Sequence, residues 1–435
     1  MDMALHDLIP LLPELVLLLA GCAILVLDLF LTDRQRDLTY VLSLVALAAA
    51  AAAAIGVGGS SHEVLMAGNF VRDPLADALK VAIFIVTALA FVYSRGYLQA
   101  RRLYRGEFYV LGLFAALGMS VMVSAGSFLS AYLGLELLAL SLYALVAFDR
   151  DAGAGSEAAI KYFVLGALAS GLLLYGISMV YGATGALDFA TVSETLRETD
   201  TDRTVLVFGL VFVVIGIAFK FGAVPFHMWV PDVYQGAPMP VTLLLGSAPK
   251  IAAFALAMRL LGDGLGALHG DWQDMLVLLA VASLALGNLV AIAQTNIKRM
   301  LAYSTISHVG FIFLGLLAGT ADGEAAAMFY AILYALMAAG AFGVLVLLSR
   351  EGVEAEQIAD LRGLNQRSPW YAAMMLLLMF SMAGVPPTAG FFAKLFVLDA
   401  VIGIDMVWLA IVAVSFSIIG AFYYLRVVKV MYFDP

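Results

Sequence analysis

The 435-residue sequence is short of cysteine and short of charge. Its one cysteine, Cys22, excludes a disulfide framework, a thiolate zinc site and a cysteine-ligated iron–sulfur cluster. Only 13% of the residues are charged while 63% are hydrophobic, a balance that soluble globular chains do not have. Apolar runs of about 18 or more residues recur along the chain. The sequence therefore predicts an all-α polytopic membrane protein.

Long hydrophilic segments are also missing, which excludes a separate soluble domain. Neither G-x-G-x-x-G nor G-x-x-x-x-G-K-[ST] occurs in the sequence, so we expect the chain to bind no nucleotide cofactor. The N-terminus reads MDMALHDLIPLLPELVLL and lacks the basic start of a signal peptide, so its apolar run is predicted to be a retained helix. The expected surroundings are the lipid bilayer, and no nucleic-acid partner is expected.

About thirteen helices are predicted to cross the membrane, on a length criterion of roughly 20 residues. They cover residues 8–31, 38–57, 75–94, 108–125, 127–148, 157–181, 204–222, 241–261, 275–294, 300–318, 325–349, 370–386 and 405–432. Lysine and arginine are more frequent in loops after odd-numbered helices, twelve against four. This bias places the N-terminus on the periplasmic side. The alanine-rich composition favours a bacterial inner (cytoplasmic) membrane.

The seventh and twelfth predicted helices are interrupted by glycine and proline. Their sequences at the breaks are FKFGAVPF and MAGVPPTAGFFAK, and apolar sequence continues over 224–235 and 388–402. Each broken helix is the fourth of a five-helix block, 108–261 or 275–432, after a three-helix segment at 1–100. An odd number of helices per block gives two inverted repeats, and matching broken helices in such repeats indicate a transport site. Simple tolerance of glycine and proline in membrane helices is the alternative.

Lysine and arginine are distributed differently along the chain. Arginines lie mainly in loops, whereas five of the seven lysines fall inside predicted apolar helices. Arginine stays charged, but burial favours the neutral form of lysine and lets it release a proton. We therefore predict that Lys220, Lys250 and Lys394 carry protons, since all three lie deep in or beside a broken stretch.

Two other lysines have competing interpretations. Lys161 lies one turn after Glu157 on the same helix face and is predicted to take part in the relay. Snorkelling of its ammonium to the membrane surface is the alternative. Lys80 follows Asp77 near a helix end and is expected to form an interfacial or structural pair.

Three further titratable residues lie inside the hydrophobic blocks. Glu136 is central to its span and is expected to pair with a lysine, so that opening or closing the pair changes the proton affinity of that lysine. A purely structural pair is the alternative. Histidine titrates near neutrality, so His227 and His308 are predicted to bridge lysines. Ser304, Thr305 and Ser307 are expected either to hydrogen-bond His308 or to order water beside it. The spacing of these groups predicts no metal site.

Several runs resemble the subunit N family of NADH:quinone oxidoreductase (respiratory complex I), within the wider antiporter-like proton-translocating family. They are YLGLELLALSLYAL, EAAIKYFVLGALASG, FKFGAVPFHMWVPDVYQGAP, APKIAAFA, IKRMLAYSTISHVGF and AGVPPTAGFFAKL, spread over about residues 100–400. The resemblance implies a proton-translocating membrane-arm subunit without redox chemistry of its own. NADH, FMN, iron–sulfur clusters and quinone would be bound by other subunits.

The resemblance also implies roles for the residues named above. Glu136 and Lys220 would be the coupling pair, Lys250 the central relay and Lys394 the residue toward the exit. Partners would be the antiporter-like M and L types and the small K, J, A and H types of membrane subunit. The family has fourteen membrane helices, and this sequence stops at YFDP after the thirteenth, so either the sequence is truncated or the final helix is absent.

Two alternatives remain at this point. The first is a subunit of an Mrp-type sodium/proton antiporter, which shares the glutamate, lysine and broken-helix plan. The second is a structural scaffold whose lysines only pair with carboxylates and lipid.

Overall fold

The computed structural model describes residues 5–59, 61–198, 203–349 and 354–435, and nearly all of them are helical. The α-helices in chain order are α1 (Leu12–Asp28), α2 (Asp37–Val57), α3 (Pro74–Ala100), α4 (Gly106–Val123), α5 (Phe128–Val146), α6 (Gly153–Thr184), α7 (Phe189–Glu198), α8 (Arg203–Phe221), α9 (Trp229–Gly236), α10 (Met239–Gly246), α11 (Ala248–Ala257), α12 (His269–Ala293), α13 (Ile297–Leu317), α14 (Ala321–Leu348), α15 (Leu364–Arg367), α16 (Pro369–Ala383), α17 (Ala389–Gly403) and α18 (Val407–Tyr432). Strands β1 (Glu63–Leu65) and β2 (Phe70–Arg72) form an antiparallel hairpin. A π-helical turn, Met258–Gly264, continues α11.

Twelve helical segments within the described ranges are long and apolar enough to cross a membrane. They confirm the prediction of an all-α polytopic membrane protein, and every predicted span coincides with a helix. The twelfth predicted span, 370–386, corresponds to α16, which has only 15 residues. It is short because α16 stops before Gly384 and the chain resumes as α17. The seventh span behaves in the same way, with α8 followed by α9.

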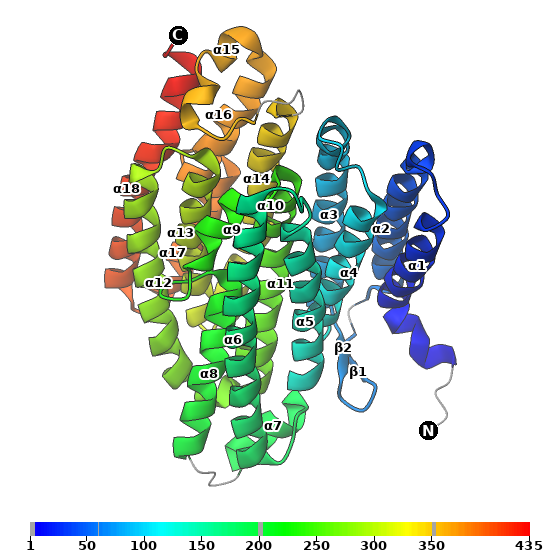
Figure 1. The fold of residues 1–435 in the computed structure, drawn as a ribbon. Helices are drawn as coiled ribbons and strands as arrows, with labels where there is room; N and C mark the ends of the chain where they lie inside the picture. Colours follow the sequence, from blue (N-terminus) through cyan, green and yellow to red (C-terminus); the bar gives the residue numbers. More distant parts are fainter. Residues whose placement is uncertain (1–4, 60, 199–202, 350–353) are drawn as a thin grey trace.

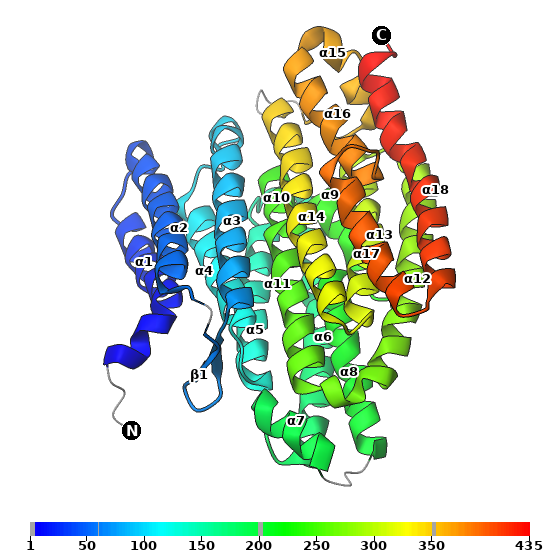
Figure 2. The same cartoon turned by 180° about the vertical axis from the view of Figure 1, so that it is seen from behind.

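The helices run mostly side by side, with α1 to α4 gathered on one side of the molecule (Figures 1 and 2). The β-hairpin and α7 lie at the end from which the N-terminus emerges, and α15 lies at the opposite end, beside the C-terminus. Residues far apart in sequence therefore share each end of the bundle.

Burial differs strongly between the edge and the centre of the bundle. In the most apolar stretch of each helix, about a third or less of the residues of α1 and α2 are buried, against 94% for the Met239–Gly264 segment and for α13. The outer helices expose apolar side chains such as Leu19, Phe30 and Ile55, as expected for surfaces that face lipid. Polar groups on α11 and α13 are consequently removed from both water and lipid, and they need partners within the protein.

Candidate functional site

Both broken helices end in the same backbone turn. At the first break, Gly222 has a φ of +78°, and the N–H groups of Gly222 and Ala223 both donate to the carbonyl of Ala218. At the second break, Gly384 has a φ of +85°, and the N–H groups of Gly384 and Val385 both donate to the carbonyl of Phe380. Glycine fits here because a left-handed residue carries a steric cost for any side chain with a Cβ. Each turn leaves the last helical carbonyls without an intrahelical donor.

Lys250 fills this need at the first break. Its Nζ donates to the carbonyl oxygen of Phe221, the last residue of α8, at 2.9 Å. The same Nζ lies 5.6 Å from the ring centroid of Trp229, the first residue of α9, and the side chain is 2% exposed. The carbonyl end of a helix carries partial negative charge, so it attracts an ammonium group. Lys250 therefore contacts both halves of the broken helix.

Lys394 has the equivalent partner at the second break. Its Nζ donates to the carbonyl oxygen of Ala383, the last residue of α16, at 2.9 Å, and to Ser417 Oγ of α18 at 2.8 Å. The ring centroid of Phe311 lies 5.1 Å from the Nζ. A cavity of about 330 Å³, lined mainly by apolar residues of the second break, α17 and α18, adjoins the amine. An added Cβ at Gly384 would lie 2.9 Å from Lys394 Cδ, so this glycine also makes room for the lysine.

Glu136 and Lys220, the coupling pair that the resemblance implies, do not form a direct ion pair. Lys220 is buried near the end of α8, and Glu136 is half buried on α5. Glu136 instead accepts a short hydrogen bond from Ser170 Oγ, and Ser170 contacts the Tyr132 hydroxyl at 3.1 Å. Both charged residues line one small cavity of about 20 Å³. A space of this size is enough for one bridging water. The Ser170 hydroxyl, not the lysine, is in direct contact with the Glu136 carboxylate.

His308 lies at the centre of a buried hydroxyl network. Its Nδ1 lies 2.7 Å from the Tyr330 hydroxyl of α14, and its Nε2 lies 3.0 Å from the Tyr424 hydroxyl of α18. Of the two expectations for Ser304, Thr305 and Ser307, the direct hydrogen bond to His308 is not formed. Their hydroxyl groups have other partners: Ser304 bonds to Tyr424, Thr305 to Tyr334, and Ser307 to Asn288.

Lys161 is less buried than a relay residue at the centre of a span would be. Its Nζ lies 2.8 Å from Glu157 and 2.9 Å from Asp232 of α9, and 43% of its side chain is exposed. The shared helix face of Glu157 and Lys161 is confirmed. His227 is half buried in the turn between α8 and α9. Within the described part of the chain, no hydrogen bond or ion pair joins His227 to a lysine.

Lys80 is more deeply buried than the sequence indicated. It is 0% exposed, and its Nζ lies 2.7 Å from Glu14 Oε1 of α1. Ser120 of α4 donates to the same carboxylate oxygen at 2.5 Å. The pair therefore joins α1, α3 and α4, which the spacing from Asp77 to Lys80 could not reveal.

Sequence reasoning placed Lys298 in a loop, yet its side chain is 1% exposed. Its Nζ donates at 2.8 Å to the carbonyl of Ala237, the residue after α9, and lies 3.5 Å from Glu356. The tyrosines around His308 were also missed, because tyrosine in an apolar helix is usual in any membrane protein. The signal that could have revealed the burial of Lys298 is its position in the first turn of a buried helix.

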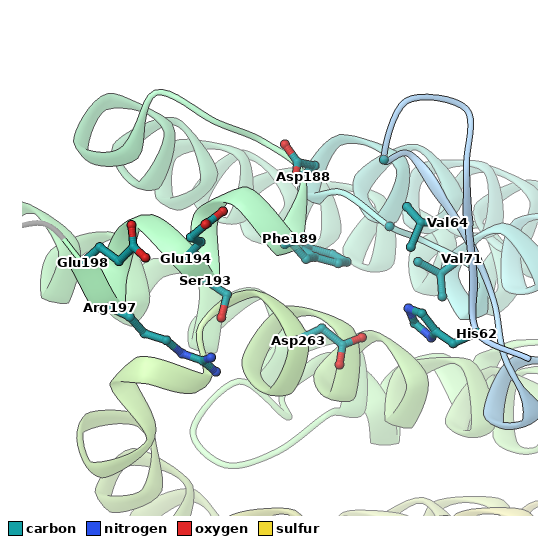
Figure 3. A pocket seen from close by; sticks show the side chains of 13 residues that line it. His62, Val64, Val71, Asp188, Phe189, Ser193, Glu194, Arg197, Glu198 and Asp263 are labelled. Carbon is teal, nitrogen blue, oxygen red and sulfur yellow. The ribbon is translucent and has the colours of Figure 1, made fainter.

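A cavity of about 480 Å³ lies near α7 and the β-hairpin, away from these lysines (Figure 3). His62, Asp188, Arg197 and Asp263 are among its lining residues. Beside it, Asp73 binds Arg259 Nη1 at 2.8 Å, and this pairing holds the pKa of the Asp73 carboxyl below its usual value even though burial opposes ionisation. Asp73 and Asp263 are thus tied to Arg259 by ion pairs.

Comparison with known proteins gives a consistent set of relatives. Residues 125–420 match the family model described as NADH:quinone oxidoreductase/Mrp antiporter, TM. NADH-quinone oxidoreductase subunit N of Thioalkalivibrio sulfidiphilus is 61% identical over 435 residues, covering 100% of this chain and 91% of the relative. Among solved structures, a chain of respiratory complex I from Thermus thermophilus with bound aureothin superimposes with a TM-score of 0.82 at 31% identity, covering 97% of this chain and 90% of that one. A chain of the Mrp complex from a Dietzia species has a TM-score of 0.83 at 23% identity, covering 100% and 81%, and is similar in fold.

Proposed function

Because this chain belongs to the family of NADH:quinone oxidoreductase and Mrp antiporter membrane subunits, we propose that it is a proton-translocating membrane subunit of NADH:quinone oxidoreductase. Its partners are the other membrane subunits of that complex. The identity of 61% over the whole chain to a subunit N favours this assignment over an Mrp-type antiporter subunit, to which the likeness is one of fold.

The chain takes part in an enzyme without redox chemistry of its own. NADH oxidation, flavin, iron–sulfur clusters and quinone reduction belong to other subunits, and this chain contributes proton translocation. A single cysteine supports this division, because iron–sulfur clusters need several thiolates. The complex lies in the bacterial inner membrane, with the N-terminus of this chain on the periplasmic side and the arginine-rich loops in the cytoplasm.

One observation carries the proposal more than any other. Lys250 and Lys394 each donate to the last carbonyl before a helix break rather than to a carboxylate. A carbonyl accepts a hydrogen bond from an ammonium group and from a neutral amine alike. A carboxylate partner would instead hold the lysine in its charged form. A lysine that faces a carbonyl can therefore lose and regain a proton while its position is kept.

The remaining polar groups extend this arrangement through the membrane. Lys220 shares a water-sized cavity with Glu136 and precedes Lys250 at the first break. His308, Tyr330 and Tyr424 form a chain of exchangeable hydrogens between α13, α14 and α18, and Lys394 lies at the second break. Lys161 and His227 flank the first break and modulate it. Residues 108–261 and 275–432 act as two inverted repeats whose breaks provide the two carbonyl sites.

The experiment that tests this function is purification of the complex through a tag on this chain. NADH-oxidising subunits should co-purify, and reconstituted vesicles should move protons on addition of NADH in sodium-free medium. Recovery of the chain with small antiporter subunits alone, or proton movement that requires sodium, would contradict the proposal.

A further inference from the structure

A second cavity, of about 450 Å³, lies at the end of the bundle where α3 ends and α13 begins. Its wall includes Lys298, Glu354 and Glu356, which the relay described above does not use. The segment carrying the two glutamates is fixed against the start of α13. The N–H of Ile297 donates to the carbonyl of Glu356 at 2.7 Å, and the N–H of Ile358 donates to the carbonyl of Thr295 at 2.9 Å. The carboxyl groups are therefore held at defined places in the cavity.

Glu354 and Glu356 lie two residues apart, line the same cavity and interact electrostatically. Two neighbouring carboxyl groups do not both ionise readily. Burial and the neighbouring Glu354 carboxyl raise the pKa of Glu356, and nearby Lys298 opposes this only in part. Glu356 therefore binds a proton more readily than an ordinary glutamate does.

The neighbours of the pair come from the end of α3 and the start of α13. Tyr97 of α3 and Arg101, the residue after α3, face Glu354: the tyrosine donates a short hydrogen bond, and Arg101 Nη2 lies 3.5 Å from the carboxylate. Lys298 of α13 faces Glu356 at 3.5 Å. These contacts favour ionisation of Glu354 and leave Glu356 as the member that takes up the proton.

The other charges around the cavity, apart from Asp149, are already paired. Asp232 binds Arg299 at 2.7 Å and Lys161 at 2.9 Å, and Glu157 binds Lys161 at 2.8 Å. A carboxylate between two cations keeps its negative charge, so Asp232 is a poor proton acceptor. Asp149 also lines the cavity. Within the described residues, the Asp149 carboxylate forms no ion pair with Lys298 or any other cation.

Lys298 connects the carboxyl pair to the first break. It donates to the carbonyl of Ala237 at the end of α9, and Trp229 at the other end of α9 lies over Lys250. An eight-residue helix is about 12 Å long, so one short helix separates the two lysines. Lys298 thus faces a carbonyl, as Lys250 and Lys394 do.

We propose that Glu354 and Glu356 form the site at which protons enter this chain from the cytoplasmic solution, and that Lys298 takes the proton onward. A proton from water binds the carboxylate pair. When Lys298 has passed a proton inward and is neutral, the Glu356 O–H proton moves to its amine, leaving a carboxylate and an ammonium. No electron moves in either step. This entry site rests on the proposed function of proton translocation.

The test uses the assembled complex in inverted membrane vesicles, whose outer solution corresponds to the cytoplasm. Glu356→Gln should leave NADH-driven proton pumping close to wild type at pH 6 and lower its rate by about fivefold at pH 8.5, where free protons are scarce. Glu356→Asp should restore the alkaline rate. Asp149→Asn, which removes a carboxylate from the same cavity, should keep the wild-type pH profile.

Lys298→Arg provides a second test that keeps the positive charge and does not rely on the Gln variant assembling. Arginine does not release a proton, so the same alkaline loss is expected. The entry site is wrong if Glu356→Gln or Lys298→Arg, in an assembled complex, follows the Asp149→Asn profile at every pH. Failure of the proposed function is distinguishable, because the wild-type complex would then move no protons with NADH.

Discussion

Lys80 and Lys250 are both buried lysines in apolar helices, at 0% and 2% exposed, yet their partners differ in kind. Lys80, in the N-terminal three-helix segment, faces the carboxylate of Glu14 at 2.7 Å. Lys250, at the first helix break, faces the carbonyl of Phe221 at 2.9 Å. The carboxylate stabilises the ammonium form of Lys80, whereas the carbonyl accepts a hydrogen bond from either form of Lys250. Burial alone therefore does not identify a lysine as a proton carrier. The group that accepts its hydrogen bond, carboxylate or carbonyl, makes the distinction.

The largest effect is expected at Lys250. Lys250→Met should lower NADH-driven proton pumping in the assembled complex by about a hundredfold, because a methionine holds no proton and general acid–base groups contribute on this scale. The measurement is proton uptake by inverted vesicles with an acridine dye. Blue native gels check that the complex assembles. Pumping within twofold of wild type by the assembled Lys250→Met complex would contradict the role of Lys250 as a proton carrier.

Lys394→Met is expected to have the next largest effect, on the order of thirtyfold, since the adjoining cavity of about 330 Å³ lets water take over part of the transfer. The same vesicle measurement applies. Ser417→Ala is the matched control: it removes one hydrogen bond of the lysine but leaves the Ala383 carbonyl as its acceptor. A loss from Ser417→Ala as large as from Lys394→Met would show that Lys394 does not carry the proton.

Glu136→Gln should reduce pumping by about tenfold, because it removes the negative charge that shares a cavity with Lys220. Glu136→Asp keeps the charge and should retain most of the activity. The comparison of the two variants at equal levels of complex separates the charge from the packing. Equal pumping by the Glu136→Gln and Glu136→Asp variants would show that the charge of Glu136 does not contribute to proton translocation.

Tyr424→Phe removes one hydroxyl from the network of His308 and should lower pumping by about fivefold, which corresponds to about 1 kcal/mol for a single hydrogen bond. Tyr423 lies next to it and donates to Asn288 Oδ1 instead. Tyr423→Phe should therefore have a smaller effect on the pumping rate. The opposite order would indicate that the relay does not pass His308.

The smallest effect on pumping is expected at Lys80. Lys80→Met should destabilise the chain by about 3–5 kcal/mol, because it leaves the Glu14 carboxylate buried without a cation. The double variant Glu14→Gln/Lys80→Met should recover most of that loss. Thermal denaturation of the purified complex measures the stability, and protons moved per electron should stay at the wild-type value in both variants. A lowered ratio in the double variant would give Lys80 a place in the relay.

The elements that sequence predicted well are those set by local composition. Apolar length fixes the spans, and the glycine and proline pattern located both breaks, with Gly222 and Gly384 in the left-handed conformation. Lys220, Lys250 and Lys394 stand out because an ionisable group within an apolar run needs a special environment.

The partners of these residues could not be predicted, because they come from helices distant in the sequence. Glu136 contacts Ser170 of α6 rather than Lys220, and Lys80 contacts Glu14 of α1. Lys298 appeared to be a loop residue, yet α9 and the segment after α14 bury it. Helix packing decides these contacts, and one sequence carries no direct record of it.

The most direct measurement of the central claim is the number of protons moved per electron by a complex that carries Lys250→Arg. Arginine preserves the positive charge, and its guanidinium is able to donate to the Phe221 carbonyl, but it does not release a proton. The account predicts that fewer protons move per NADH oxidised in reconstituted vesicles than with the wild-type complex. An unchanged ratio would contradict it, because Lys250 would then serve only as a fixed charge.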